Sequence, residues 1–459
     1  MTVGQIRWIR GYRRISTFKT RPERDGQMIS LVENQAVQAE LLTDKGKLRQ
    51  QVDLAVNKTQ AIDVHTHVHP PAFKGLFLSG IDDLLTYHYL IAETLRSSDL
   101  SHACFWRMSK SERADFVWKT LFVESTPLSE AARGIVTILN AFSLDTRAPN
   151  LDEARAFFAA QKETTHLDRV LEMASVSDLV MTNDPFSEQE VQAWQSGLTP
   201  DDRFHASLRL DTLLNDWPAP VEGLKTQDFN ISANLSSTTF DELRRFLDKW
   251  ILRMRPVYMA VSLPAEFQYP VDDERTRLLK EVIMPTAREH GLSLALMIGV
   301  RRSVNPALRS AGDGLGKADI TALERICAEF PDVKFLATLL SRENQHELCV
   351  AARKFNNLLP FGCWWFLNNP SIVSEITAER LELLGPSFVP QHSDARVLEQ
   401  LVYKWQHSRT VIAETLYETY ARLLDSGRAV MPKEITRDVT RLFSGNFRKW
   451  VGMAGQDLL

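Results

Sequence analysis

Two histidines at the end of an apolar run are spaced for joint binding of a metal ion. His65 and His67 occur in the segment Asp63-Val64-His65-Thr66-His67, which closes an expected strand over Ala61–His65. Alternate residues of a strand point to the same side, so the two imidazoles project together. Imidazoles are common ligands of Zn2+ and other divalent metals, and the alternative is an ordinary surface pair. His69 continues the alternation but directly precedes two prolines, where the strand should already have ended, so it is not counted as a ligand.

A third, anionic ligand is expected from Asp394. This residue lies in His392-Ser393-Asp394-Ala395-Arg396, directly after the last apolar run. In a closed barrel the eighth strand lies beside the first, which would bring Asp394 next to the histidine pair. Two histidines and one carboxylate leave positions open for substrate, and we expect one divalent metal ion, with Zn2+ the first choice and manganese, iron or nickel also acceptable. The competing interpretation makes Asp394 the N-cap of a helix that begins near Arg396.

The elements that must position these residues are short apolar runs that alternate with amphipathic segments from residue 60 onward. This rhythm predicts parallel β/α units, hence the α/β class. Eight runs favour a closed (β/α)8 barrel (a TIM barrel), although a doubly wound sheet could show a similar rhythm. The expected strands are Ala61–His65, Asp178–Met181, His205–Leu210, Val257–Ser262, Ser293–Ile298, Lys334–Thr338, Leu358–Phe361 and Phe388–Gln391.

The interval between the first and second expected strands contains no convincing strand. Apolar residues recur there at helical spacing, as in Phe116, Val117 and Leu121, which places them on one face of a helix. We therefore expect the barrel to be distorted by a large helical insertion over about residues 75–175. Similar spacing after Arg396 predicts a helical C-terminal tail.

The overall composition is that of an ordinary globular protein. The 459 residues are 44% hydrophobic and 24% charged, with a net charge of −4. This composition excludes disorder as the main state, and the slight acidic excess argues against a nucleic-acid partner. No apolar run approaches the roughly 18 residues of a membrane span. Four widely spaced cysteines fit a reducing compartment, so a cytoplasmic enzyme is expected.

Residues 1–27 differ from the remainder because they hold seven basic and only two acidic residues. We expect a basic, poorly ordered N-terminal extension, followed by a metal-dependent barrel over residues 28–459. An over-long start before Met28 is an equivalent explanation. A transit sequence is the alternative, since such segments are rich in arginine and poor in acidic residues.

From about residue 30 to the C-terminus, the sequence resembles uronate isomerases (glucuronate isomerases) of the amidohydrolase superfamily. The short motifs are Asp-x-His-x-His, Tyr87-His88-Tyr89, Leu208–Asp211, Trp364-Trp365-Phe366 and Ser393–Arg396. The resemblance is strongest to a divergent bacterial branch. It rests on the longer strings Leu84–Leu90, Met181–Phe186, Leu340–Leu348, Phe361–Pro370 and Gln391–Leu401, which are more specific than any single motif.

The resemblance implies a distorted (β/α)8 barrel and an aldose–ketose isomerisation. D-glucuronate would become D-fructuronate, and D-galacturonate would become D-tagaturonate. By motif, the metal ligands are His65, His67 and Asp394, and the catalytic residues are Tyr89, His88, Asp394 and Arg396. The expected substrate-binding residues are Arg209, Arg302 and Trp365. The partner is a small hexuronate, with no nucleic acid and no membrane, and a homo-oligomer is expected.

The chain departs from the main branch of that family at two places. Met297 stands where the branch has a histidine, which removes a polar contact, and Asn368-Asn369 replaces its Asn-Asp pair. Both changes concern substrate preference rather than the metal ligands.

The chemistry requires a base at C2, a return of the proton to C1 and stabilisation of an enediolate. A metal acts as Lewis acid, and guanidinium groups stabilise oxyanions and bind carboxylates in a bidentate manner. Our hypothesis is that Tyr89 moves the C2 proton, provided that metal and arginine lower its pKa. Asp394 would then handle hydroxyl protons and ring opening.

Several of these residues have simpler interpretations. Tyr87-His88-Tyr89 could pack beneath the insertion, and Arg209 could merely pair with Asp211. Trp364 is expected in the core, with Trp365 facing the barrel mouth. Arg342 and His346 follow the sixth strand and could reach substrate, although a surface position is expected for one of them.

Two other functions use the same barrel. The first is a mononuclear metal-dependent hydrolase; a binuclear version is disfavoured because the fourth strand ends without a lysine for a bridging carbamate. The second is a non-catalytic sugar-acid sensor, which the presence of all expected ligands disfavours.

Overall fold

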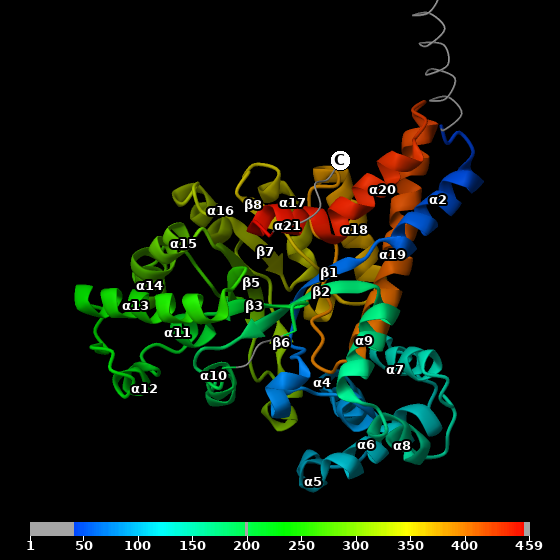
Figure 1. Cartoon of the computed structure of the whole chain (residues 1–459), viewed down its shortest axis with the longest axis horizontal. Coiled ribbons are helices and arrows are strands. Elements are labelled where there is room, and N and C mark those ends of the chain that lie inside the picture. Colours follow the sequence, from blue (N-terminus) through cyan, green and yellow to red (C-terminus); the bar gives the residue numbers. More distant parts are fainter. Residues whose placement is uncertain (1–40, 198–200, 454–459) are drawn as a thin grey trace, which may run out of the picture.

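The computed structural model describes residues 41–197 and 201–453 and has a curled parallel sheet at its centre (Figure 1). Seven parallel strands lie in the order β1-β2-β3-β4-β5-β7-β8, and β6 pairs antiparallel with β5. The strands are β1 (Ala61–Thr66), β2 (Val176–Asn183), β3 (Phe204–Arg209), β4 (Tyr258–Pro264), β5 (Ser293–Arg301), β6 (Gly314–Leu315), β7 (Phe335–Leu339) and β8 (Leu358–Pro360). The prediction of parallel β/α units is confirmed. The basic segment 1–27 lies outside the described residues.

The prediction of an eighth strand over Phe388–Gln391 is wrong. Only Val389 pairs there, in an isolated parallel bridge with Phe361. Pro390 follows at once and has no N–H to donate, so a ladder cannot continue. The barrel instead closes onto β1 through single backbone hydrogen bonds: Asp394 N donates to His65 O at 3.1 Å, and His67 N donates to Ala395 O at 2.7 Å.

The helices that cover the sheet follow the strands as expected of β/α units (Figure 1). They are α10 (Glu188–Gln195), α11 (Asp211–Asn215), α12 (Val221–Lys225), α13 (Ser237–Met254), α14 (Glu274–Leu278), η3 (Leu279–Ile283), α15 (Met284–His290), η4 (Pro306–Gly312), α16 (Ile320–Glu329), η5 (Arg342–Asn344), α17 (Gln345–Ala352), η6 (Trp365–Leu367) and α18 (Pro370–Leu384). Helix α13 illustrates the cause: Ser236 caps its first turn, and Leu243, Leu247 and Trp250 form a buried stripe. Because helices cover the sheet, β1 is buried along its whole length.

The helical insertion after β1 is present and lies to one side of the sheet (Figure 1). It contains η1 (Pro71–Leu76), α3 (Ile81–Leu85), α4 (His88–Arg96), α5 (His102–Arg107), α6 (Lys110–Trp118), η2 (Lys119–Val123), α7 (Glu130–Ala141), α8 (Asp152–Ala159) and α9 (Glu163–Ala174). The C-terminal region is helical too, with α19 (Gln400–Asp425), α20 (Pro432–Thr440), η7 (Arg441–Gly445) and α21 (Asn446–Val451). Helix α2 (Lys45–Lys58) runs beside α19.

A buried carboxylate fastens the insertion to the C-terminal region. Glu399 is fully buried and accepts hydrogen bonds from Ser79 Oγ at 2.6 Å and from the backbone N–H of Gly80, the N-cap of α3. Its Oε1 also lies 2.8 Å from Nε2 of His166 in α9. One side chain next to the Asp394 loop therefore contacts both ends of the insertion.

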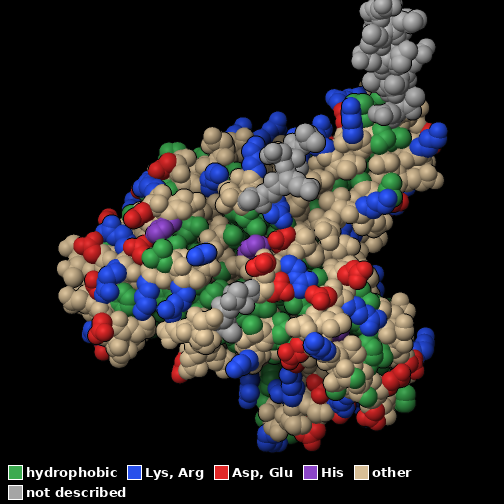
Figure 2. All heavy atoms as spheres, viewed as in Figure 1, with side chains coloured by type: hydrophobic (Ala, Val, Ile, Leu, Met, Phe, Trp, Pro, Cys, Tyr) green, Lys and Arg blue, Asp and Glu red, His purple; other side chains and the backbone are tan. Residues whose placement is uncertain are grey.

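The visible surface carries acidic and basic side chains interspersed with one another (Figure 2). None of the described helices has the length and apolar character needed to cross a membrane.

Arg409 of α19 ties together two helix ends. Its Nη1 donates to Val56 O and Thr59 O at the end of α2, and its Nη2 donates to Ser175 O at the end of α9, at 2.9 Å. The last carbonyls of a helix have no partner within the helix, so the bonds to Val56 O and Thr59 O satisfy acceptors that the end of α2 leaves open. Ser175 O also accepts from Ala61 N at 2.9 Å, so there the guanidinium adds a second donor.

We expect Arg409→Met to lower the free energy of unfolding by about 2–4 kcal/mol, because Val56 O and Thr59 O lose their charged donor and Ser175 O loses one of its two donors. Urea titration measures the change. The matched control is Arg422→Met on the same helix, whose exposed ion pair with Glu382 should contribute less than about 0.5 kcal/mol. Equal effects of the two substitutions would contradict the assignment.

Candidate active site

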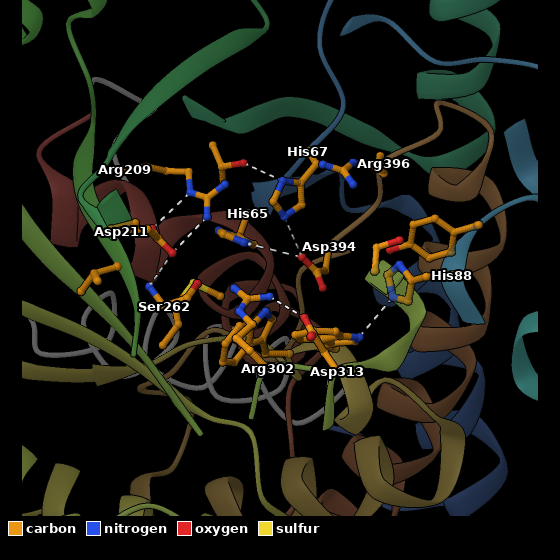
Figure 3. Close-up of a pocket in the computed structure, with 18 residues that line it drawn as sticks. His65, His67, His88, Arg209, Asp211, Ser262, Arg302, Asp313, Asp394 and Arg396 are labelled. Carbon is orange, nitrogen blue, oxygen red and sulfur yellow. Dashed lines mark hydrogen bonds and ion pairs between the residues drawn. The ribbon is translucent and has the colours of Figure 1, made fainter. Parts of the chain in front are cut away.

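A cavity of about 200 Å³ lies at the carboxyl ends of the strands, where barrel enzymes hold their functional groups. Figure 3 shows side chains converging on it from strands, loops and the insertion. The lining residues are His65, His67, Tyr87, His88, Thr182, Arg209, Asp211, Ala260, Val261, Ser262, Met297, Arg302, Ser310, Asp313, Trp364, Trp365, Asp394 and Arg396. All predicted site residues except Tyr89 are among them.

The three predicted metal ligands face one another (Figure 3). Asp394 Oδ1 lies 3.6 Å from His65 Nε2 and 3.4 Å from His67 Nε2. Their ligand atoms all lie within 4.8 Å of one another. Asp394 does not cap a helix, since α19 begins only at Gln400 with Glu399 as its N-cap. The N-cap interpretation is therefore wrong.

The outer nitrogens of both imidazoles are held by hydroxyl groups. His67 Nδ1 lies 2.9 Å from Thr182 Oγ1. His65 Nδ1 lies 3.4 Å from the Tyr258 hydroxyl, which itself donates to Val64 O at 2.7 Å. Because the Tyr258 proton is used in that bond, Nδ1 of His65 is the donor and its Nε2 presents a lone pair toward Asp394. Metal-binding histidines are oriented in this way, so the residues present fit a divalent metal.

Burial keeps both imidazoles neutral. Removal from water lowers the pKa of His65 to about 3, although the Asp394 carboxylate acts in the opposite direction. Burial also holds the pKa of His67 well below the usual histidine value, and the Arg396 guanidinium adds to this effect. Metal ligation requires unprotonated imidazole, so these environments favour the binding form at neutral pH.

Asp63, the first residue of the Asp-x-His-x-His motif, holds the Asp394 loop in place. Its fully buried carboxylate accepts hydrogen bonds from Ser393 N at 2.9 Å and from Trp405 Nε1 at 3.2 Å. Gly362 permits the same packing from the other side, because its φ is +67° and an added Cβ would lie 1.8 Å from Cδ2 of His392. The Asp394 loop is thus held in place by contacts on both of its sides.

Three arginines line the cavity, and they differ in whether a carboxylate pairs with them. Arg209 holds Asp211 with two contacts, Nε to Oδ2 at 3.2 Å and Nη2 to Oδ1 at 3.0 Å. It therefore both pairs with Asp211 and lines the cavity. Arg302, in the loop after β5, donates to Asp313 Oδ2 at 2.6 Å. Arg396 has no carboxylate partner within the described part of the chain.

His88 and Trp365 are joined across the cavity wall. The indole Nε1 of Trp365 lies 3.1 Å from His88 Nε2. An indole can only donate, so Nε2 accepts and the proton of a neutral His88 is on Nδ1. Burial lowers the pKa of His88 to about 4, which keeps the ring neutral. Trp364 is 4% exposed, as expected for the core, but it lines the cavity as well.

Tyr89 is the predicted residue that the structure places outside the main cavity. Its neighbours Tyr87 and His88 line that cavity, whereas Tyr89 lines an adjoining one and its buried hydroxyl has no hydrogen-bond partner. Burial raises the pKa of Tyr89 well above 10, and Tyr87 and Asp394 add to this. The shift is opposite to the lowering that the hypothesis requires.

Arg342 and His346 do not reach the cavity. Both are exposed and pair with carboxylates of α18, Arg342 with Glu375 and His346 with Glu379. Asn368 and Asn369, the pair that differs from the main branch of the family, both form structural hydrogen bonds. Asn368 Oδ1 accepts from Gln391 Nε2 at 3.0 Å, and Asn369 caps α18. Met297, in contrast, faces the cavity.

Several contributing residues were missed from the sequence. Thr182 and Tyr258 orient the imidazoles, and Asp313 holds Arg302. Thr182 lies one residue beyond the expected end of the second strand, which could have identified it. Tyr258 and Asp313 carry no local signal, because their partners are distant in the sequence.

No protein-family model and no curated protein matches the sequence. Among solved structures, the chain is similar to a uronate isomerase from Bacillus halodurans C-125, with 48% identity over 90% of this chain and 97% of that chain and a TM-score of 0.88. It also resembles a uronate isomerase from Thermotoga maritima (16% identity, 88% and 97% coverage, TM-score 0.71). A glucuronate isomerase from Caulobacter crescentus is similar as well, with 15% identity, coverage of 90% of this chain and 96% of that chain, and a TM-score of 0.72. At these lower identities the likeness concerns the fold alone.

We expect the substitutions His65→Asn, His67→Asn and Asp394→Asn each to weaken binding of a divalent metal by at least about tenfold, because each removes a ligand atom. Metal content after dialysis, with Zn2+ as the probe, measures the loss.

His69→Gln is the matched control. His69 continues the alternation of the pair, but it does not line the cavity and faces Glu190 at 3.8 Å. This variant should keep its metal. Loss of metal from it alone, with the three other variants unaffected, would contradict the assignment of the ligands.

Proposed function

Because the chain belongs to the uronate isomerase family, we propose that it is an aldose–ketose isomerase of hexuronates that uses one divalent metal ion, Zn2+ in the first instance. The reactions proposed are D-glucuronate to D-fructuronate and D-galacturonate to D-tagaturonate. The observation that carries the proposal is the joint presence, in one cavity, of a His-His-Asp ligand group and three arginines. A metal-assisted hydrolase would use the first group but has no evident need for the arginines.

The arginines suit a substrate with a carboxylate at one end and developing negative charge at the other. The pair with Asp211 uses Nε and Nη2 of Arg209, which leaves Nη1 for a substrate oxygen. Arg209 and Arg302 are proposed to hold the C6 carboxylate, a planar anion that matches guanidinium geometry. Arg396 is proposed to stabilise the enediolate oxygen, since it approaches the ligand group closely enough to lower the pKa of His67.

A divalent metal held by His65, His67 and Asp394 would polarise the C1 carbonyl and the C2 hydroxyl as a Lewis acid. The chain itself supplies the proton carriers. Tyr89 is proposed to move the proton from C2 to C1, which requires its hydroxyl to reach the substrate from the adjoining cavity that it lines. Asp394 is proposed to exchange hydroxyl protons during ring opening. Neutral His88, with Nε2 occupied by Trp365, offers its Nδ1–H as a donor to a substrate oxygen, and Trp365 packs against the sugar.

The isomerase activity is tested by proton NMR of zinc-loaded protein in D2O, with D-glucuronate and D-galacturonate supplied separately. We expect the ketose to appear and C1 to carry deuterium if the transferred proton exchanges with solvent. Chelated protein is the control. No ketose from either sugar, with the metal confirmed as bound, would overturn the proposal, and hydrolysis of sugar lactones would then be assayed.

Tyr89→Phe should abolish C2 proton exchange, a loss of about 10²–10⁴-fold, while the metal stays bound, because the phenol oxygen is the proton carrier. The matched control is Tyr403→Phe, which removes a second hydroxyl group from the lining of the same adjoining cavity. Retained exchange in Tyr89→Phe would move the role to Asp394 or His88.

A further inference from the structure

A second cavity, of about 160 Å³, adjoins the active site. Trp365 lines both cavities, so it forms a wall that they share. The residues that line the second cavity are Tyr89, Glu130, Ala131, Trp365, Phe366, Asn368, Asn369, Tyr403 and Lys404. Four of them, Tyr89, Glu130, Tyr403 and Lys404, carry a titratable group.

Lys404 places a buried amine against the face of Tyr89. The residue lies in the first turns of α19 and is only 5% exposed. Its Nζ is 5.5 Å from the ring centroid of Tyr89 and 5.6 Å from that of Tyr403. Ammonium groups are attracted to aromatic faces at this distance. A negative charge on the Tyr89 oxygen would add a direct attraction between opposite charges.

The carboxylates around Lys404 are occupied by other partners. Glu130 of α7 pairs with Arg133 and with His407. Asp63 of β1 accepts from Ser393 and Trp405. Within the described residues, Lys404 Nζ forms no ion pair of its own. A buried charge without a pair is costly, and a perturbed titratable group that lines a cavity is a candidate for a functional role.

The charged and titratable groups that face Lys404 come from several elements. Burial lowers its pKa to about 8, and the carboxylates of Asp394, Glu130 and Asp63 act in the opposite direction. In turn, Lys404 lowers the pKa of His88 and of His392, and it opposes the effect of burial on Asp394. The remaining titratable neighbours are the phenols of Tyr89 and Tyr403. Lys404 is therefore positively charged at neutral pH and faces both the phenol and the metal-ligand side.

We propose that Lys404 is a positioning residue for the isomerisation: its ammonium group stabilises the phenolate form of Tyr89, which accepts the C2 proton. This inference rests on the proposed function and extends it. It gives a cationic neighbour to a phenol whose pKa is raised by burial and by Tyr87 and Asp394.

The step balances without a further reactant. The C2–H bond breaks and the proton goes to the Tyr89 oxygen, while the electron pair forms the C1–C2 double bond and the carbonyl pair moves onto the C1 oxygen. In the second half, the Tyr89 O–H bond breaks and C1 receives the proton. The C2 hydroxyl proton passes to the C1 oxygen, which leaves the carbonyl at C2.

Lys404→Met and Lys404→Arg test the proposal, with kcat and KM measured against pH in the zinc-loaded enzyme. Loss of the positive charge should lower kcat by about 10²-fold, leave KM within about threefold, and move the acidic limb of the kcat profile to higher pH. Lys404→Arg keeps the charge and should recover most of kcat. Melting temperatures of both variants control for folding.

Ultraviolet difference titration of tyrosinate, with Tyr89→Phe as the blank, reads the Tyr89 ionisation directly. We expect Lys404→Met to raise the pKa of Tyr89 and Lys404→Arg to leave it near that of the parent. An unchanged Tyr89 titration in Lys404→Met would overturn the proposal, even if kcat fell. The titration does not depend on catalytic turnover, so it tests the role of Lys404 even in an inactive protein. Absence of ketose from the parent enzyme would instead refute the proposed function.

Discussion

The closure of the barrel between its last and first strands is the constraint on which the site depends. Seven strands are joined by ladders, whereas the eighth segment touches β8 only at Val389 and reaches β1 through the hydrogen bonds of residues 393–395. A regular ladder would fix each side chain by the two-residue period. Asp394 instead has a φ of +50°, a left-handed conformation that aspartate tolerates, and its carboxylate lies beside both imidazoles.

Burial determines how the charges of the site behave. The imidazoles stay neutral because partial or full burial disfavours their charged form, and Arg396 adds to this at His67. Arg209 and Arg302 are each held by a carboxylate, whereas Arg396 has no such partner within the described residues. An unpaired cation beside a neutral ligand pair retains its attraction for an incoming anion, which a fully paired cation would have lost. The cavity is therefore suited to negatively charged substrates.

The sequence allowed prediction of the parts of the site that depend on local period and on topology. Strand alternation identified His65 and His67, and barrel closure identified Asp394, because both rules act over short or fixed relations. Prediction from the sequence failed where a single side chain determines the local structure or a distant contact. Pro390 ended the eighth strand early, and Tyr258 reaches His65 from a strand nearly two hundred residues away. The roles of the residues stay predictions, since geometry alone does not test them.

The insertion belongs to the site as much as the barrel does. It contributes His88 and Tyr89, while the barrel contributes the metal-ligand group, so the two parts must keep a fixed distance. Glu399 meets this need, because it follows the Asp394 loop and holds both Gly80 and His166. A buried carboxylate with several donors resists displacement more strongly than an apolar contact of equal area, since breaking it leaves a charge unpaired. Electrostatic bonding, and not packing alone, therefore sets the geometry between the His88–Tyr89 segment of the insertion and the His-His-Asp group of the barrel.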